Sequence, residues 1–247
     1  MYSDMLLKTE QPKMLSEVIG IISELVTEVK LKLNKDGLTI IAVDPANVAM
    51  IIFKVPASAF SQFEAGEETI GINLEILRAV LKICTAGSSL IMKNEDGFLK
   101  IEIVDKIKRE FMLSILDLES KDKPIPELEF ATRIEMNSLD FAAAIEDCAI
   151  VSDSCGFEAE PTNFFIFAKG PINSAKLSYS SDEIDLSSAI KSKSRYSIEY
   201  LMKMTKAAKI TDKAIINFST DYPLKLEFKN QNIELGFILA PRIETED

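Results

Sequence analysis

Several stretches of the chain alternate apolar and polar residues with a period of two. They are Glu28–Asn34 (EVKLKLN), Phe98–Val104 (FLKIEIV), Ser174–Ser180 (SAKLSYS) and Pro223–Lys229 (PLKLEFK). This pattern is typical of antiparallel strands with one face on a core and the other in water. Glycine-containing turn sequences at Asn34–Gly37, Asn94–Gly97 and Ala168–Pro171 separate the strands.

Four other segments place apolar residues at helical spacing. They are Pro12–Leu25, Asn73–Cys84, Ser138–Ala149 and Ser197–Ala208. In each segment the apolar stripe covers one side only, so each predicted helix should lie on a sheet instead of being buried all round.

The second half of the chain repeats the pattern of the first half after about 124 residues. At this offset Leu15 meets Leu139, Phe53 meets Leu177, and Asn73–Lys82 (NLEILRAVLK) meets Ser197–Lys206 (SIEYLMKMTK). A constant offset through helices, strands and turns indicates an internal duplication.

The repeat predicts an α+β fold of two duplicated domains, each with two helices packed on antiparallel sheets. Two strands that alternate well, Arg109–Leu116 and Asn173–Ser180, would leave open sheet edges unless another chain covers them. Head-to-tail pairing of two different edges generates a ring if the rotation closes.

The composition favours an intracellular protein in a reducing compartment. The chain is 47% hydrophobic, yet no apolar run approaches the roughly 18 residues that a membrane span needs. The N-terminal residues lack the pattern of a signal peptide. Three cysteines without CxxC spacing suggest neither a disulfide framework nor a zinc site.

Missing residue types argue against most kinds of catalysis. The chain has no histidine, the commonest general base, and no glycine-rich phosphate loop. A carboxylate-dependent metal hydrolase remains as an alternative, with Asp36, Asp44 and Asp96 as the candidate Mg²⁺ ligands. The net charge of −11 disfavours nucleic acid as a partner unless the basic residues gather on one surface.

Four segments in order resemble the DNA sliding clamp, proliferating cell nuclear antigen (PCNA), and its archaeal members above all. They are Asp36–Pro56, Ile70–Lys82, Leu116–Phe130 and Phe237–Glu244. The more specific pieces are the DP turn after an alternating strand, the IPE of the third segment and the final LAPR.

The resemblance implies a clamp domain at 1–116, a connecting loop at 117–130 and a second clamp domain at 131–247. It implies a ring of three subunits around duplex DNA, without catalytic activity, cofactor or membrane. The expected partners are a clamp loader, DNA polymerase, flap nuclease and ligase, and the expected location is the cytoplasm or nucleoid.

Basic residues recur on three of the four predicted helices, although the chain is acidic. These residues, expected to face DNA, are Lys13, Arg78, Lys82, Lys203, Lys206 and Lys209. A solvated helix face is the simpler interpretation of any one helix. Segregation over three helices favours sequence-independent phosphate contacts. The predicted helix at Ser138–Ala149 differs from the other three, since it carries Asp140, Glu146 and Asp147 and no basic residue.

The resemblance also places a pocket for short partner motifs that contain a Gln, an aliphatic residue and two aromatic residues. Its expected lining is Val43, Asn47, Val48, Met50, Ile125, Pro126, Phe130, Pro223, Ile238, Ala240 and Pro241. Leu118 and Leu128 are expected instead to pin the connecting loop. Asn47 stands where many members have His, and Lys123 stands where eukaryotic members have a Leu in this loop.

The subunit seam is expected to join the strand Arg109–Leu116 of one subunit to Asn173–Ser180 of the next. The residues assigned to it are Arg109, Phe111, Met112, Leu113, Ile115, Ala175, Leu177 and Tyr179. The acidic third helix and Lys123 leave open whether the ring is a homotrimer or a heterotrimer of sibling subunits. A protein-interaction scaffold that does not bind DNA is a further alternative.

Overall fold

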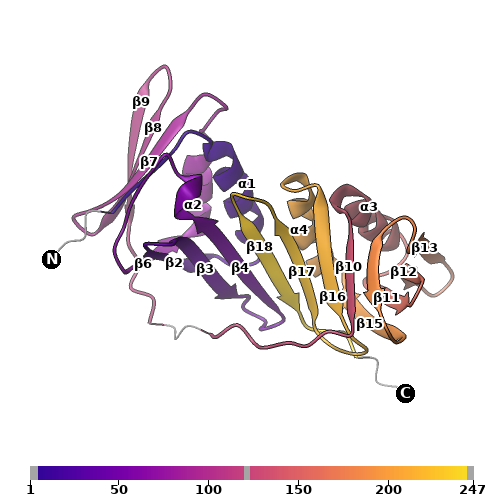
Figure 1. Ribbon diagram of the computed structural model, residues 1–247. Coiled ribbons are helices and arrows are strands. Elements are labelled where there is room, and N and C mark those ends of the chain that lie inside the picture. The colour runs from indigo at the N-terminus through magenta and orange to yellow at the C-terminus, as the bar shows by residue number, and fades with distance from the viewer. Residues whose placement is uncertain (1–4, 120–122, 244–247) are drawn as a thin grey trace. The chain divides into compact units, whose positions relative to one another are not determined.

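A computed structural model describes residues 5–119 and 123–243 (Figure 1). The chain packs into two compact units. The first comprises the described residues of Met1–Pro45, Ile51–Pro124 and Asn230–Leu235. The second comprises those of Ala46–Met50, Ile125–Lys229 and Gly236–Asp247.

The first unit contains two runs of antiparallel strands. One has the order β5 (Gln62–Glu64), β1 (Leu6–Thr9), β7 (Ser89–Glu95), β8 (Phe98–Val104) and β9 (Lys108–Ser114). The other has the order β4 (Ala49–Pro56), β3 (Gly37–Val43), β2 (Glu28–Asn34) and β6 (Glu68–Asn73). A short 3₁₀ helix, η1 (Ala57–Ala59), follows β4.

Turn chemistry sets the register of the first unit. Asn34 Oδ1 accepts hydrogen bonds from the N–H groups of Asp36 (2.9 Å) and Gly37 (3.3 Å). Gly37 has a φ of 149°, and a Cβ there would lie 2.1 Å from the Val55 carbonyl oxygen, so only glycine fits. Between β7 and β8, Asp96 and Gly97 both have positive φ, as a two-residue hairpin turn favours.

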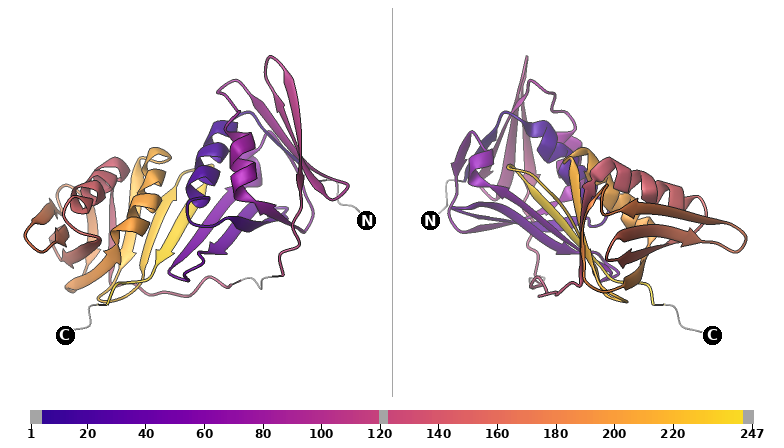
Figure 2. Two further views of the ribbon diagram at one scale, coloured as in Figure 1. Left: turned by 180° about the vertical axis from the view of Figure 1, so that it is seen from behind. Right: turned by 45° about the vertical axis from the view of Figure 1, so that its right-hand side comes forward.

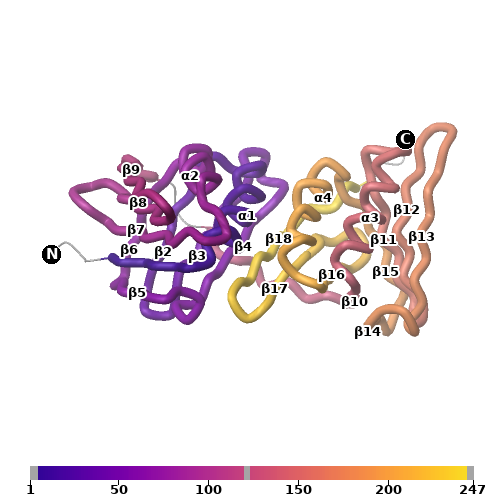
Figure 3. The backbone as a smooth tube through the Cα atoms, turned by 90° about the horizontal axis from the view of Figure 1, so that it is seen from above, coloured from indigo at the N-terminus to yellow at the C-terminus, as the bar shows by residue number. Residues whose placement is uncertain are grey.

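The second unit repeats this plan. Its strands run β14 (Asp185–Ser188), β10 (Thr132–Asn137), β16 (Lys213–Phe218), β17 (Leu224–Lys229) and β18 (Glu234–Leu239) in one order. The other order is β13 (Ser174–Ser180), β12 (Asn163–Lys169), β11 (Ser154–Glu160) and β15 (Ser192–Ser197). Figure 3 shows β11, β12 and β13 side by side, with β13 outermost.

Over the residues that the structure describes, each unit has one pair of helices, which lie side by side (Figure 2). The pairs are α1 (Pro12–Ile22) with α2 (Leu74–Leu81), and α3 (Ser138–Ala149) with α4 (Ile198–Met204) and its 3₁₀ continuation η2 (Thr205–Lys209). Asn73 and Asn137 cap α2 and α3, because their side chains accept backbone hydrogen bonds from the first helical turn. No helix among the described residues is long and apolar enough to cross a membrane.

The predicted duplication is visible element by element. Shifted by 124 residues, β6 coincides with β15, α2 begins where α4 begins, and the strand order of each sheet is the same in both units. The expected α+β fold of two duplicated halves is therefore confirmed. Three predicted helices end earlier than expected: α1 ends at Ile22 and not Leu25, and α2 ends at Leu81 and not Cys84. The helix predicted at Ser197–Ala208 ends as α-helix at Met204 and continues as a 3₁₀ helix.

The two cores use different side chains at equivalent positions. In the second unit Phe157 contacts the rings of Phe141, Phe164, Tyr196 and Phe218, with ring centroids 5.3 to 6.0 Å apart. At the positions equivalent to Phe157, Phe164 and Tyr196 the first unit has the aliphatic residues Leu33, Ile40 and Ile72, which are also buried. One fold is thus filled by aromatic packing in one copy and by aliphatic packing in the other.

Candidate interaction surfaces

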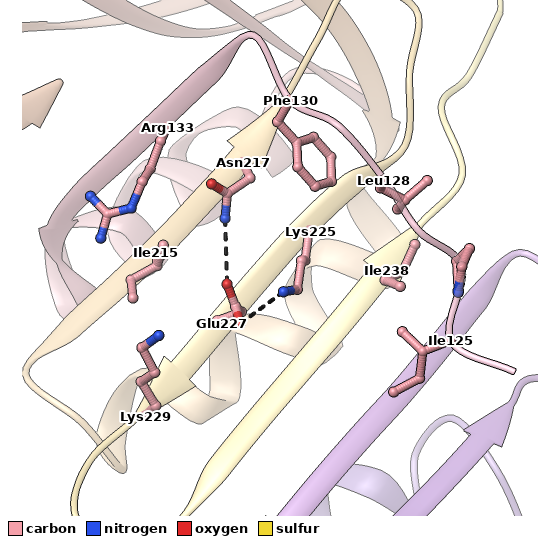
Figure 4. A pocket seen from close by; sticks show the side chains of 11 residues that line it. Ile125, Leu128, Phe130, Arg133, Ile215, Asn217, Lys225, Glu227, Lys229 and Ile238 are labelled. Atoms are coloured by element: carbon pink, nitrogen blue, oxygen red, sulfur yellow. Dashed lines mark hydrogen bonds and ion pairs between the residues drawn. The ribbon is translucent and has the colours of Figure 1, made fainter. Parts of the chain in front are cut away.

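A cavity of about 260 Å³ opens in the second unit, beside the segment that follows Pro124 (Figure 4). This segment supplies one wall, and strands β16 and β17 supply the floor. The lining residues are Ile125, Pro126, Leu128, Phe130, Arg133, Ile215, Asn217, Lys225, Glu227, Lys229 and Ile238.

The wall is held in place where it joins the second unit. The N–H of Ala131 donates a hydrogen bond to Ser219 Oγ (2.8 Å), and the Phe130 ring packs edge-on against Tyr222 at 5.9 Å. Pro126 removes a backbone donor and stiffens the chain, which favours an extended course over the sheet. Ile125 remains 39% exposed, so its side chain is available to a ligand.

The floor of the cavity is polar and internally paired. Glu227 is 8% exposed; its Oε1 lies 3.1 Å from Lys225 Nζ, and its Oε2 accepts a hydrogen bond from Asn217 Nδ2 at 3.5 Å (Figure 4). Pairing of this nearly buried carboxylate offsets the cost of its desolvation. The cavity therefore offers an apolar wall to a hydrophobic side chain and hydrogen-bonding groups to a polar one.

The structure brings four of the eleven predicted pocket residues to this cavity: Ile125, Pro126, Phe130 and Ile238. The remaining seven are not part of its lining. Of these, Val43 belongs to β3 of the first unit, while Ala240 donates its N–H to the Val48 carbonyl (2.9 Å) within the second unit. Asn47 occupies a turn with a φ of 56°.

Sequence reasoning missed the polar floor. In the strand Leu224–Lys229 it assigned Leu224, Leu226 and Phe228 to the core, as found, and left the alternate residues to solvent. Those alternate residues, Lys225, Glu227 and Lys229, line the cavity. The period-two pattern itself could have identified them once the connecting segment was placed over this face.

The two leucines expected to pin the connecting segment behave differently. Leu118 packs close to Gly71 of β6, where an added Cβ would lie 3.0 Å from Leu118 Cγ. The N–H of Leu116 donates to the Gly71 carbonyl (2.9 Å), which fixes the start of the segment on the first unit. Leu128 instead lines the cavity together with Ile125 and Phe130.

The three basic residues predicted to face DNA in the first unit differ in exposure. Lys13 at the start of α1 and Lys82 at the end of α2 are exposed. Arg78 is half-buried beside α1, and its Nη1 donates to Ser23 Oγ at 3.3 Å. Its Nε is a buried polar atom without a hydrogen-bond partner among the described residues.

The 3₁₀ geometry of η2 aligns the basic residues of the second unit. Lys206 and Lys209 are exposed, and at three residues per turn a spacing of three keeps them on one edge. Lys203, one turn earlier on α4, pairs with Glu199 at 2.8 Å and lies over the Tyr200 ring. The Lys203 hydrogen bond lowers the pKa of the Glu199 carboxyl.

Helix α3 presents the opposite charge. Asp140, Glu146 and Asp147 are all exposed, while Phe141 and Ile145 face the core. The helix pair of the second unit therefore exposes carboxylates on one member and ammonium groups on the other.

Two strands that the sequence marked as sheet edges are edges in the structure. β9 ends the order of one sheet in the first unit, and β13 ends the order of one sheet in the second unit. In β9, Phe111 and Leu113 alternate with the exposed Met112. In β13, Ala175, Leu177 and Tyr179 are half-buried. Arg109 pairs with Asp105 at 2.8 Å, and Ile115 directly follows β9.

The three aspartates of the hydrolase alternative lie in separate places within the first unit. Asp36 and Asp96 sit in the two hairpin turns described above, and Asp44 is buried after β3. Over residues 5–119 and 123–243, no group of three His, Cys, Asp or Glu side chains is close enough to hold a metal ion.

Comparison with known proteins identifies the class of fold and then the family. A solved structure of PCNA from Entamoeba histolytica (20% identical, TM-score 0.91, covering 98% of this chain and 100% of that chain) shares the fold. A PCNA2–PCNA3 complex from Sulfolobus tokodaii is similar at 27% identity, with a TM-score of 0.89 over 97% of this chain and 100% of that chain.

The N-terminal domain family of proliferating cell nuclear antigen matches residues 5–123, and the C-terminal domain family matches residues 124–243. The chain is 33% identical to a DNA polymerase sliding clamp from Pyrococcus abyssi, over 95% of this chain and 97% of the relative. It is 32% identical to DNA polymerase sliding clamp 1 from Thermococcus kodakarensis, over 94% and 96%. The chain belongs to the proliferating cell nuclear antigen family.

Proposed function

We propose that this chain is a DNA sliding clamp: a ring subunit that encircles duplex DNA and tethers DNA polymerase as a processivity factor. The observation that carries the proposal is the nearly full-length match to archaeal sliding clamps at 33% identity. The duplicated fold, in which β9 and β13 are edge strands, supports it, because a ring needs two complementary edges on each subunit.

The ring closes where β9 of one subunit pairs with β13 of the next. The duplication supports this pairing, since β18 is the counterpart of β9 and β4 is the counterpart of β13. The first unit includes the start of β18 with most of β4, and there Lys54 Nζ lies 3.4 Å from Glu234 Oε1. In the second, Ala240 donates to the Val48 carbonyl, just beyond these strands.

Four exposed lysines contact DNA phosphates: Lys13, Lys82, Lys206 and Lys209. Arg78 and Lys203 are half-buried and add positive charge on the same helices. Contacts of exposed ammonium groups with phosphates are independent of sequence and weakened by salt, which suits a protein that slides. The acidic face of α3 keeps the attraction weak, so topology and not affinity holds the ring on DNA.

Partner enzymes dock in the cavity beside Ile125, through a short motif with an aliphatic residue and aromatic residues. Polymerase, flap nuclease, ligase and the clamp loader are the partner classes in this proposal, and the chain itself performs no catalysis. The proposal includes two clamp domains, 1–116 and 131–247, joined by a loop at 117–130. It also includes an intracellular location.

A loading experiment tests the proposal. Clamp loader, ATP and nicked circular DNA should give a stable complex, and cutting the circle once should release the protein from the DNA. Retention after linearisation would mean adhesion to the DNA surface instead of encirclement. The triple change Lys203→Ala, Lys206→Ala and Lys209→Ala should reduce loading with the subunit assembly unchanged, whereas Lys35→Ala with Lys106→Ala should load normally.

A heteromeric ring is a second candidate, because the PCNA2–PCNA3 complex from Sulfolobus tokodaii has this fold at 27% identity. Light scattering of the purified chain separates the two assemblies. A homotrimeric mass at micromolar concentration supports the homotrimer, and a monomeric mass supports a heteromeric ring.

A further inference from the structure

The second unit carries another cavity, on the face of the sheet β13-β12-β11-β15 that lies away from α3. Its volume is about 350 Å³, and its lining includes Phe165, Phe167, Lys169, Lys176, Lys193 and Glu158. We call these residues, together with Arg195, the aromatic–basic face. It shares no lining residue with the cavity beside Ile125.

Strand β12 positions the two phenylalanines of this face. Phe164, Ile166 and Ala168 are buried toward the core, so Phe165 and Phe167 point to the other face, where both are half-buried. An aromatic residue at both positions is unusual for a face in contact with solvent, where polar residues are expected.

A glycine makes room for one of the rings. Gly156 of β11 is the cross-strand neighbour of Phe167, and a Cβ at Gly156 would lie 2.3 to 2.7 Å from the end of the Phe167 ring. The ring therefore rests down on the sheet against Gly156, and its position is fixed by the backbone below it.

Cations surround both rings. Lys176 Nζ lies 4.0 Å from the Phe165 ring centroid, and Lys193 Nζ and Arg195 Cζ lie 5.4 and 5.8 Å from that of Phe167. These distances fall within the range of cation–π attraction, which holds the cationic groups over the ring faces.

The local charge is opposite to that of the chain. Five cations gather here with two carboxylates: Lys169, Lys176, Lys191, Lys193 and Arg195 with Glu158 and Glu160. Both carboxylates pair with Lys191 (2.7 and 3.0 Å), and Glu158 also lies 3.7 Å from Lys193 Nζ. The chain as a whole has a net charge of −11. A basic patch on an acidic chain is not needed to keep the protein soluble. The local surplus of positive charge therefore favours an anionic ligand.

We propose that the aromatic–basic face binds single-stranded nucleic acid. One base takes the place of Lys193 and Arg195 over the Phe167 ring, and Lys169, Lys176 and Lys193 bind the phosphates on either side. Aromatic rings among cations are the shared chemistry of single-strand binding sites, because every base has a face that can stack. A duplex would use the cations alone, since its bases are already stacked on one another and cannot stack on Phe167. An acidic peptide would use the cations but would gain nothing specific from the ring over Gly156.

The test measures binding of a labelled 15-nucleotide oligothymidylate to the intact protein by fluorescence anisotropy, at several salt concentrations. Phe167→Leu should raise the Kd roughly tenfold, because the stacking is removed, with the salt dependence unchanged. Lys176→Gln with Lys193→Gln should instead flatten the slope of log K against log salt by about 0.7 for each phosphate that the variant no longer neutralises.

Matched controls locate the effect. Phe98→Leu, an exposed ring of the first unit, and Lys35→Gln with Lys106→Gln should leave both the Kd and the slope unchanged. The triple alanine change at Lys203, Lys206 and Lys209 should also leave oligothymidylate binding unchanged, although it reduces loading onto circles. The two proposals can therefore fail separately.

Gly156→Ala supplies a second variant that pushes the Phe167 ring off the sheet without altering charge, and it should weaken binding as Phe167→Leu does. Circular dichroism confirms the fold of each variant; if the Phe167 and Gly156 variants do not fold, the slope of the lysine variant decides. Unchanged Kd and slope in all the variants of this face would overturn the proposal. Displacement of the oligomer by polyglutamate, with no effect of Phe167→Leu, would also overturn it and assign the face to acidic peptides.

Discussion

The two units carry a glutamate at equivalent positions of their corresponding strands, but in different surroundings. Glu102 on β8 and Glu227 on β17 are 7% and 8% exposed, and each pairs with the lysine two residues before it. Around Glu102 stand Lys93 (3.5 Å), Lys100 (3.8 Å) and Lys108 (2.9 Å), which close the surface with ion pairs.

Around Glu227, Asn217 takes the place of Lys93, and the segment Ile125–Phe130 with Ile238 bounds the space above it. The same sheet position is therefore a closed ion-pair cluster in the first unit and the floor of a cavity in the second. A duplicated fold acquires a binding site when neighbouring cations are exchanged for an apolar wall, with the strand order unchanged.

The largest expected effect comes from truncating a core residue, and it tests the difference between the aromatic and the aliphatic core. Phe157→Ala should lower the free energy of unfolding by about 4 kcal/mol, because it removes a fully buried ring and its aromatic contacts. Leu33→Ala at the equivalent place in the first unit should cost about 3 kcal/mol. Guanidinium unfolding compares the two variants; a smaller loss for Phe157→Ala would contradict the importance of the aromatic cluster.

The next effect concerns the wall of the cavity. Ile125→Ala should weaken binding of a partner-motif peptide roughly tenfold, since it removes apolar surface from the wall while the floor remains. Titration calorimetry measures the Kd, and Ile107→Ala, an exposed isoleucine of the first unit, is the control. A double change of Ala240 and Pro241 to Gly and Ala should have a smaller effect, because neither residue lines the cavity.

A third prediction concerns the closed cluster. The Lys108 hydrogen bond, with Lys93 and Lys100 nearby, lowers the pKa of Glu102 below the unfolded value of 4.5. A lowered folded-state pKa stabilises the protein above pH 4.5, and this contribution is lost as the pH falls through the folded-state pKa. It is on the order of 1 kcal/mol, since Lys108 is largely exposed.

Urea unfolding at pH 7 and at pH 3.5 checks this. Glu102→Gln and Lys108→Gln should each reduce the difference between the two pH values, and the double variant should do little more than either alone. Fully additive losses would show that the two side chains do not act as a pair.

The smallest expected effect concerns the contrast between α3 and η2. Replacing Asp140, Glu146 and Asp147 with their amides should increase loading onto circular DNA by about two- to threefold, because like charge near the phosphates is removed. The gain should vanish at high salt, where surface charges are screened. Equal loading of this variant and the unmodified protein at low salt would show that α3 does not face DNA.

Local pattern accounts for most of the fold. The apolar stripe of Ser138–Ala149 and the alternation of Glu28–Asn34 predict the bounds of α3 and β2 as the structure has them. The offset of 124 residues predicts the equivalence of β6 and β15. These features depend on contacts close in sequence or on a repeat, both of which a single sequence displays.

The lining of the cavity beside Ile125 was harder to predict from the sequence, because its parts are distant along the chain. Whether Lys225 and Glu227 meet solvent or a cavity depends on the segment at Ile125–Phe130, about a hundred residues earlier. The half-buried position of Arg78 depends on Gly20 of α1 and on Ser23, which directly follows that helix. The change to 3₁₀ geometry after Met204 is likewise absent from the apolar stripe, which fits both helix types over one turn.

The contact between Phe130 and Tyr222 also has a spectroscopic consequence. Tyr222 joins the end of the connecting segment to the core, because its carbonyl accepts a hydrogen bond from the Tyr196 hydroxyl (2.9 Å) while its ring meets Phe130. The chain contains five tyrosines and no tryptophan, so tyrosine emission is not lost to an indole acceptor. Ligand entry beside Phe130 should therefore alter the intrinsic fluorescence, and the protein reports its own occupancy without a label.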